Sequence, residues 1–551
     1  MHVHLNQSIR HFFLIGMLSF CTQSNWIPSM LGSPQNTFYS STQYSKDTCN
    51  QTCCDNQFFC KTFLLPRSQA TDTARRLLAR HFFINDYKNN EYTNIVCNSN
   101  TYAQSFNHAE TGAYFSPRCG SHSFTFGAEN GQKIDVRSQD FGFSCTGLIT
   151  LLPKYEAWST EISLFIIKNA CDLDFFIDIN IPIVHIEWDT NCCIDTLETE
   201  CAQSFDCGLM SISASETAVG TQNPAAAFNG QFLWGDVGHV QQFGQFRCGK
   251  EDPITRVAEI EIGLGTWIAQ GDWWNCGIKL IGKIPTGNRS NARSLLDPIA
   301  GNGGHAEAGV GIISYALLWE SDTSKKLMLN AAAQITHLFD REQTRLFDLK
   351  KNGCFSRYLL LKEFENNGKQ YSGLERGPNV FTHCINTKIN AQFDAALILS
   401  YLHSCFLFDV GYNFWGRTEE SISRFCGTIT NMQYGIKGTI PVIEGEIISD
   451  ECMVMGDPNL QTASLSTIIT TKGKENGTDG AKPVFITADD LNLCSALAPA
   501  AYSQSILANI SWIWPDHELS PFFGLGGKVE FAAKNSSLNL WAFWFRGGMN
   551  F

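Results

Sequence analysis

Apolar and polar residues alternate with a period of two along much of the chain, and residues 389–416 show this pattern clearly. Up to Tyr401 the apolar residues share one parity, while Asp394 and other polar residues hold the second parity. After residues 403–404 the parity changes, and Phe406 begins a second alternating run. A change of parity across a tight turn keeps one continuous apolar face, as a β-hairpin requires. The pattern therefore predicts two antiparallel strands, each with about the 9–11 residues that a tilted strand needs to cross a membrane.

The same alternation recurs in other segments, near residues 174–183, 258–268, 276–287, 305–320, 327–336 and 523–531. The segment at 305–320 slips by one position near Ile312 and Ile313, which predicts a β-bulge there. Ionised residues and glycines occupy the polar parity throughout. Alternation of this kind fits a soluble sandwich, with its polar face in water, and it equally fits a membrane barrel, with its apolar face in lipid. Other features of the chain have to separate these two folds.

The first 24 residues resemble a secretory signal peptide in their order of segments. Arg10 is followed by an apolar run, and then by polar residues up to about Ser24. This order predicts export and cleavage near Ser24. An N-terminal core helix is the alternative interpretation of this segment.

The C-terminal strand carries a resemblance to a known class of protein. Phe543, Phe545, Met549 and Phe551 share one parity up to the last residue, and only Gly547 interrupts the pattern. This pattern resembles the closing strand of Gram-negative outer-membrane β-barrel proteins, which typically end in an aromatic residue preceded by apolar residues at alternate positions. The resemblance implies that these four residues are the signal read by the barrel assembly machinery, and that the surroundings are outer-membrane lipid.

Together these features predict an all-β fold, a single-chain antiparallel transmembrane β-barrel of about 14 strands, with 12–18 strands open. We expect a signal peptide at 1–24, a Cys-rich N-terminal segment at 25–110, and the barrel at 111–551. The segment at 25–110 forms an extension, a plug or the first strands. Irregular stretches near 189–253 and 418–495 are expected to be long external loops.

Composition narrows the class of partner. The chain has 551 residues, of which 40 are Lys or Arg and 53 are Asp or Glu, so its net charge is -13. A negative chain gives no electrostatic support for binding nucleic acid.

The chain has 21 cysteines, many of them in two clusters. Their spacing lacks the paired C-x2-C knuckles of zinc sites, so we expect no metal, and disulfides are the better interpretation for an exported chain. The candidates are Cys49, Cys53, Cys54, Cys60, Cys192, Cys193, Cys201 and Cys207. In cysteine richness alone, the chain resembles the disulfide-linked major envelope porins of chlamydia-type bacteria. Two kinds of partner are left open by the sequence: further copies of this chain in a homo-oligomer, and disulfide-linked proteins of the envelope.

Motifs of catalysis are not found in the sequence: there is no H-E-x-x-H, no phosphate loop and no G-x-S-x-G. We therefore expect no enzymatic activity, no catalytic residue and no cofactor. Charged residues on the polar parity are expected to face the lumen, where they either solvate a wet interior or set charge selectivity. These candidates are Glu259, Glu261, Lys279, Lys283, Asp394 and Arg546.

The leading functional hypothesis is an outer-membrane, porin-like channel for passive passage of small polar solutes. A first alternative is a structural or adhesive surface protein, in which the barrel anchors disulfide-rich loops, and a lumen blocked by large inward side chains would favour it. A second alternative is a secreted, disulfide-rich, soluble β protein.

Overall fold

The computed structural model describes residues 92–105, 123–127, 135–151, 153–170, 173–197, 201, 220–321, 325–353, 355–368, 370–437, 485–514, 520–533 and 539–550. Several predictions lie outside these residues. They concern the signal peptide at 1–24 and the residues Cys49, Cys53, Cys54, Cys60, Cys207 and Phe551.

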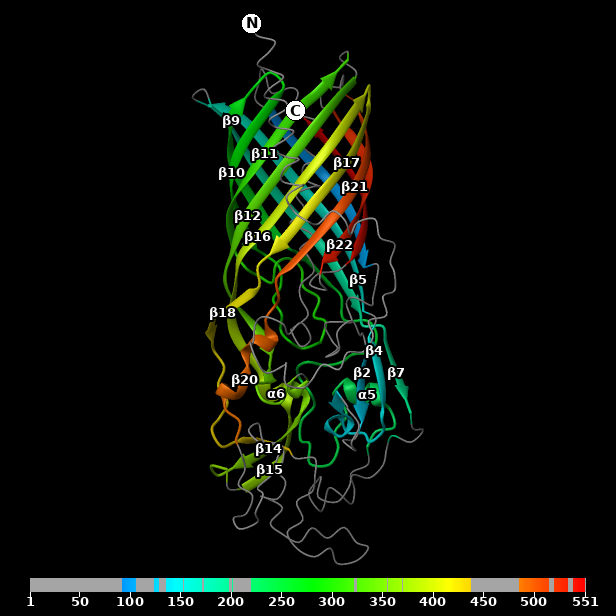
Figure 1. The fold of residues 1–551 in the computed structure, drawn as a ribbon, viewed down its shortest axis with the longest axis vertical. Helices are drawn as coiled ribbons and strands as arrows, with labels where there is room; N and C mark the ends of the chain where they lie inside the picture. The colour runs from blue at the N-terminus through cyan, green and yellow to red at the C-terminus, as the bar shows by residue number, and fades with distance from the viewer. Residues whose placement is uncertain are drawn as a thin grey trace, which may run out of the picture. The chain divides into compact units, whose positions relative to one another are not determined.

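Twelve of the described strands close into a ring in which every pairing is antiparallel, and each strand pairs with the next ring strand along the chain (Figure 1). They are β1 (Tyr92–Ser105), β5 (Lys154–Ala170), β6 (Leu173–Asp189), β9 (Glu259–Gln270), β10 (Trp274–Pro285), β11 (Glu307–Glu320), β12 (Lys325–Leu346), β16 (Thr382–His403), β17 (Phe406–Arg417), β21 (Ala501–Ile513), β22 (Phe522–Ala533) and β23 (Leu540–Asn550). The last strand, β23, pairs back with β1, and for example Trp544 lies opposite Thr101. Closure leaves no unpaired sheet edge, which is what lets β-strands cross a hydrocarbon layer.

Two short strands extend this sheet beyond the ring. β8 (Ile254–Val257) pairs with β6, and β18 (Glu420–Phe425) pairs with β16. The sheet therefore counts 14 strands among the described residues, twelve of which form the ring. The predicted antiparallel transmembrane barrel is therefore confirmed, and its twelve ring strands lie within the predicted range of 12–18.

The predicted hairpin at 389–416 is present as β16 and β17. His403 lies opposite Phe406, so Ser404 and Cys405 form a two-residue turn, and Ser404 has a φ of 58°. Tight hairpin turns of this kind use positive φ values because the resulting twist matches that of the strands. The apolar parity predicted from the sequence is therefore continuous across the turn.

The bulge expected near Ile312 and Ile313 is wrong. Alternation continues there, with Ile312 exposed on the outer face and Ile313 buried inside, and the register shift comes later, between Leu317 and Trp319. The pattern suggested a bulge because Ile313 is an apolar residue on the otherwise polar, inward parity. It belongs to the same buried hydrophobic cluster as Trp267.

The outer face of the ring is apolar and exposed. Leu264, Ile268, Leu280 and Val410 are each more than half exposed, while the residues between them point inward. Exposed apolar surface on this scale is unfavourable in water and favourable in lipid, so a closed ring with this outer face is a transmembrane barrel.

The connections at the two ends of the ring differ in length. Short turns join β5 to β6, β9 to β10, β11 to β12, β16 to β17 and β21 to β22. At the other end, long connections lie at 106–153, 190–258, 286–306, 347–381 and 418–500, and only β22 to β23 is short. The irregular stretches near 189–253 and 418–495 lie at this long-loop end. The ring itself starts at Tyr92, inside the segment 25–110, for which first strands were one expectation.

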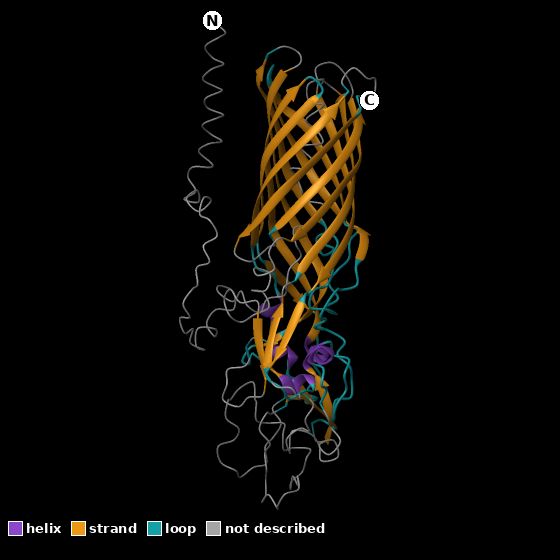
Figure 2. Cartoon of the chain, turned by 90° about the vertical axis from the view of Figure 1, so that its right-hand side faces the viewer, coloured by secondary structure: helices purple, strands orange, loops and turns teal. Residues whose placement is uncertain are grey.

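The long connections fold into small sheets (Figure 2). One sheet contains β2 (Ser123–Gly127), β3 (Val136–Arg137), β4 (Gly147–Leu151) and β7 (Cys192–Thr196). Another contains β14 (Leu360–Glu365), β15 (Gln370–Arg376) and β19 (Tyr434–Ile436), and a third pairs β13 (Asp348–Leu349) with β20 (Leu491–Asn492). The helices of the described residues are short: α5 (Pro224–Phe228), α6 (Gly377–Phe381), and the 3-10 turns η4 (Ser138–Phe141), η5 (Ser356–Tyr358), η6 (Ala488–Asp490) and η7 (Leu493–Ala496).

These loop segments have hydrophobic cores of their own. Phe126, Phe141, Phe143 and Phe228 pack together with ring centroids 4.6 to 5.6 Å apart. A second core gathers Phe347, Phe381 and other buried residues of the 347–381 and 418–500 connections. Within the described residues, no helix has both the length and the apolar character needed to cross a membrane.

Candidate functional site: the barrel lumen

The inward parity of the ring holds all six residues that the sequence predicts to face the lumen. Glu259, Glu261, Lys279, Lys283, Asp394 and Arg546 are each at most 5% exposed. Successive side chains of a strand point to opposite faces, so these residues share the face opposite to the apolar outer one. Burial of charged groups is costly unless partners compensate them, so the partners decide what the interior can do.

A group of side chains around β10, which we call the β10 charge cluster, joins four neighbouring strands. Lys279 Nζ lies 3.1 Å from a carboxylate oxygen of Asp178 and 3.5 Å from one of Glu261. Lys283 Nζ lies 3.8 Å from Glu261 and 2.9 Å from Glu307. The two ammonium groups therefore alternate with three carboxylates across β6, β9, β10 and β11.

The β10 charge cluster extends further through hydrogen bonds. Thr336 Oγ1 donates to Glu307 at 2.8 Å, and Asn302 Nδ2 donates to it at 2.6 Å. Asn180 Nδ2 donates to Asp178 at 3.0 Å. Neither Asp178 nor Glu307 is among the lumen-facing candidates predicted from the sequence, although both stand on the polar parity of their strands, which is the signal that identifies such residues.

A second group lies around Arg546 on β23. Arg546 lies 3.8 Å from Asp409, and its guanidinium donates to Ser511 Oγ at 3.1 Å. Asn509 Nδ2 donates to Asp409 at 2.8 Å, and Trp544 Nε1 donates to Asn509 at 3.3 Å. This network links β17, β21 and β23, so Arg546 is fixed in place by its neighbours on the ring wall.

Asp394 lies on β16. Its carboxylate accepts a hydrogen bond from Asn413 Nδ2 at 2.7 Å, between β16 and β17. On β22, Lys528 lies 3.0 Å from Glu530, which also accepts from Ser503 at 2.5 Å.

Carboxylates outnumber cations on the inward parity of the described ring strands. Eight acidic residues are buried there, against five basic ones. The acids are Glu161, Asp178, Glu259, Glu261, Glu307, Asp394, Asp409 and Glu530, and the bases are Lys279, Lys283, Arg345, Lys528 and Arg546. A lumen with an excess of fixed negative charge favours cations by its local potential.

A layer of apolar side chains also lies inside the ring, and we call it the inner apolar layer. Its members form one buried cluster contributed by β5, β6, β9, β11, β12, β16, β21 and β23: Phe165, Ile167, Phe176, Trp267, Ile313, Ala332, Ala396, Ile398, Leu507 and Trp544. Its aromatic rings are in contact, with the centroid of Phe176 5.5 Å from that of Phe165 and 5.4 Å from that of Trp267.

Glycines on the ring wall make room for this layer. A Cβ atom at Gly265 would lie 2.2 Å from the ring of Phe176, and one at Gly526 would lie 2.6 Å from the indole of Trp544. Both glycines stand on the inward parity, where a side chain would collide with these aromatic rings. The aromatic side chains are therefore seated directly against backbone, and sequence reasoning, which assigned the inward parity to polar groups, missed them.

The assembly-signal candidates on β23 face outward, except for the terminal residue, which lies outside the described part. Phe543, Phe545 and Met549 are 49%, 46% and 39% exposed. Their recognition by the assembly machinery stays a prediction.

Among the described residues, two disulfides connect segments of the loops. Cys145 is bonded to Cys201, and Cys192 is bonded to Cys248. Cys193 differs from the prediction, because its thiol is free and exposed. Successive side chains of β7 point to opposite faces, so Cys192 packs against the loop core and Cys193 points to solvent. The partner Cys248 was not singled out from the sequence.

Comparison with known proteins gives little beyond the fold. No family model matches the chain, and no curated protein matches it. Among solved structures, an outer membrane channel from Pseudomonas putida F1 is 8% identical, with 85% of this chain and 98% of that chain covered and a TM-score of 0.34. The transport unit of the autotransporter AIDA-I from Escherichia coli is 10% identical (88% and 100% covered, TM-score 0.26), and a Pseudomonas aeruginosa FadL homologue is 8% identical (84% and 90% covered, TM-score 0.26). Likeness at these TM-scores carries no argument about function, which has to come from the barrel's own geometry.

Proposed function

We propose that this protein is an outer-membrane channel that passes small polar solutes by diffusion. The observation that carries the proposal is the polarity of the closed ring: large apolar side chains face outward, and ionised side chains face inward. Lipid solvates the outer face, and the inward charges provide a path that polar solutes can follow. An anchor that only crosses the membrane has no need of the thirteen ionised groups that the described ring strands turn inward.

The inner apolar layer sets the limit on this passage. Hydrophobic constrictions in channels restrict flow because water and ions leave a narrow apolar section. With Phe176 and Trp544 seated against wall glycines, the layer is the narrow section of this path. Conduction through the wild-type channel is accordingly small, and it favours cations because carboxylates exceed cations on the wall.

Planar-bilayer recording of the purified full chain tests this proposal. The Trp544→Ala variant removes a large inward side chain, so its single-channel conductance is expected to be several-fold above wild type. The Phe543→Ala variant is the matched control, because this neighbouring aromatic residue faces outward, and its conductance is expected to equal that of wild type. A salt gradient should give a reversal potential of cation-selective sign, and Asp409→Asn should reduce it.

A surface anchor is the second candidate, and two observations favour it. The inward side chains are buried, and the long loops carry folded, disulfide-braced cores. Under this alternative, the bilayer stays silent with both the wild-type chain and Trp544→Ala. That result would overturn the channel and leave presentation of the loops as the function.

A further inference from the structure

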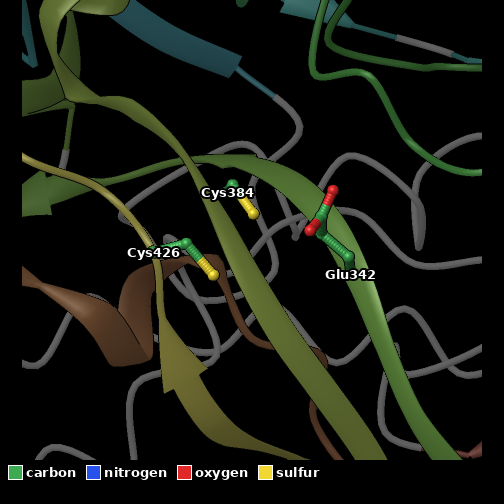
Figure 3. Close-up of side chains that lie close together, drawn as sticks. All are labelled: Glu342, Cys384 and Cys426. Carbon is green, nitrogen blue, oxygen red and sulfur yellow. The ribbon is translucent and has the colours of Figure 1, made fainter.

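Three side chains with metal-binding chemistry converge where strands extend beyond the ring. Glu342 is on β12, Cys384 is on β16, and Cys426 directly follows β18. One ligand atom from each residue lies within 4.8 Å of the others. Figure 3 shows that the three side chains come from three separate segments and gather in one place.

Strand pairing holds these residues together. Glu342 lies opposite Asn386 and two positions from Thr344, which is opposite Cys384. On the other side of β16, the backbone N–H of Cys426 donates to the carbonyl of Cys384 at 3.0 Å. The pairing of β12 with β16 and of β16 with β18 therefore fixes the spacing of the three residues without a bound ligand.

The cluster is on the outer face of this part of the sheet. Gln343, Arg345 and Ile385, on the opposite parity, are buried inside, whereas Glu342 and Cys426 are exposed. A solute outside the barrel can reach the cluster, which is separate from the lumen groups described above.

The donor set fits a thiophilic cation. Zinc binds thiolate sulfur at about 2.3 Å and carboxylate oxygen at about 2.0–2.2 Å, so neighbouring ligands of a tetrahedral site lie roughly 3.3–3.8 Å apart. Side-chain rotation alone can close a cluster already within 4.8 Å to that spacing. Calcium and magnesium prefer all-oxygen sites, and two sulfur donors disfavour them.

Both thiols are free, which sets them apart from Cys145, Cys192, Cys201 and Cys248, which are bonded in disulfides. We propose that Glu342, Cys384 and Cys426 bind a thiophilic divalent cation such as Zn²⁺, with a fourth position open to solvent. Each thiol loses its proton to water on binding, so two thiolates and one carboxylate hold the ion. The bound ion joins β12, β16 and β18 where the 418–500 connection leaves the ring.

Sequence reasoning expected no metal because it looked for closely spaced cysteine pairs. Here the ligands are separated by about forty residues each, at positions 342, 384 and 426. Only the antiparallel pairing of β12, β16 and β18 brings them together.

Cadmium binding to the full chain, isolated in detergent without oxygen, tests the site. Cd²⁺ shares the ligand preference of zinc, and it gives a thiolate-to-metal charge-transfer band in the ultraviolet. Equilibrium dialysis with metal analysis is expected to show one Cd²⁺ fewer per chain in the Cys384→Ser/Cys426→Ser variant, together with a weaker band. The matched control is Cys276→Ser/Cys405→Ser, which removes two free thiols elsewhere and is expected to keep the wild-type stoichiometry.

The Glu342→Gln variant keeps both thiols and serves if the double variant fails to fold, as judged by heat-modifiable gel migration. Loss of an outer-sphere partner commonly weakens metal binding about 10–100-fold, so loss of this direct ligand is expected to weaken it at least tenfold. Equal cadmium stoichiometry and affinity in the variants and wild type would overturn the site. So would a Cys384–Cys426 disulfide found by mass spectrometry in the freshly isolated chain.

Discussion

The ring and the loop cores use the same period-two pattern with opposite results. On β10 of the ring, Leu280 is 65% exposed and Lys283 is 3% exposed. On β2 of the loop sheet, Phe124 and Phe126 are fully buried, while Ser123 and Thr125 are half-buried. In the ring the apolar parity faces out, and in the loop sheet it faces in.

This difference shows that the surrounding solvent decides which parity of a strand lies on the outer surface. A loop sheet in water buries its apolar parity against a protein core, such as the one that contains Phe141 and Phe228. A ring in lipid exposes that parity to acyl chains and turns its polar side chains toward one another. The following variants test whether the two regions obey these separate rules.

The largest expected effect is confined to the loop region. The Cys145–Cys201 disulfide closes a loop with a sequence separation of 56 residues, and loop-closure entropy gives about 4 kcal/mol for its contribution. In Cys145→Ser/Cys201→Ser, the long loops are expected to become sensitive to limited proteolysis, while the ring keeps its resistance to SDS before boiling. Parallel loss of both properties would show that the two regions do not fold separately.

Charge on the outer face comes next. Leu280→Arg is expected to lower the free energy of unfolding in lipid vesicles by about 2–4 kcal/mol, because arginine near the bilayer midplane loses its hydration. Leu197→Arg is the control from the loop region, where the side chain is 80% exposed, and it is expected to change stability by less than about 0.5 kcal/mol. Equal effects at the two positions would mean that lipid does not surround the ring.

A smaller effect depends on pH and comes from Glu251 in the 190–258 connection. Burial raises the pKa of this carboxyl to about 7, against the opposing influence of Ser294 and Arg247. Well below pH 4.5, which is the usual pKa of this group, the carboxyl is protonated in both the folded and the unfolded chain. As pH rises from 4.5 to 7, the unfolded chain ionises first, so stability is lost over this window and stays low above it.

This loss amounts to at most about 3 kcal/mol, since one pKa unit corresponds to about 1.4 kcal/mol. Denaturant unfolding of the loop region between pH 4.5 and 8 measures it. Glu251→Gln is expected to flatten the dependence, whereas Asp252→Asn, whose side chain is 90% exposed, is expected to keep it. A wild-type profile without a fall in this range would contradict the assignment.

Several features of the fold and site could be predicted from residue order. The hairpin of β16 and β17 follows from a change of parity at residues 403–404, and the inward placement of Lys279, Asp394 and Arg546 follows from alternation within one strand. These are local properties, because neighbouring side chains on a strand always point to opposite faces.

The partners of these residues could not be predicted in the same way. Lys283 meets Glu307 because β10 and β11 pair in a particular register, and Arg546 meets Asp409 across strands that are distant in sequence. The inner apolar layer was missed for a related reason, since Phe176 and Trp544 interrupt a parity that otherwise reads as polar.

The sequence by itself determined that this chain forms strands with alternating apolar and polar residues. It also determined which parity of each strand is apolar and which ionised residues share the other parity. Tertiary structure alone decided that twelve strands close on themselves, which carboxylate meets which lysine, and that Glu342, Cys384 and Cys426 come together. The physical reason is that alternation acts over two residues, whereas ring closure, register and ligand clusters depend on hydrogen bonds between strands tens to hundreds of residues apart.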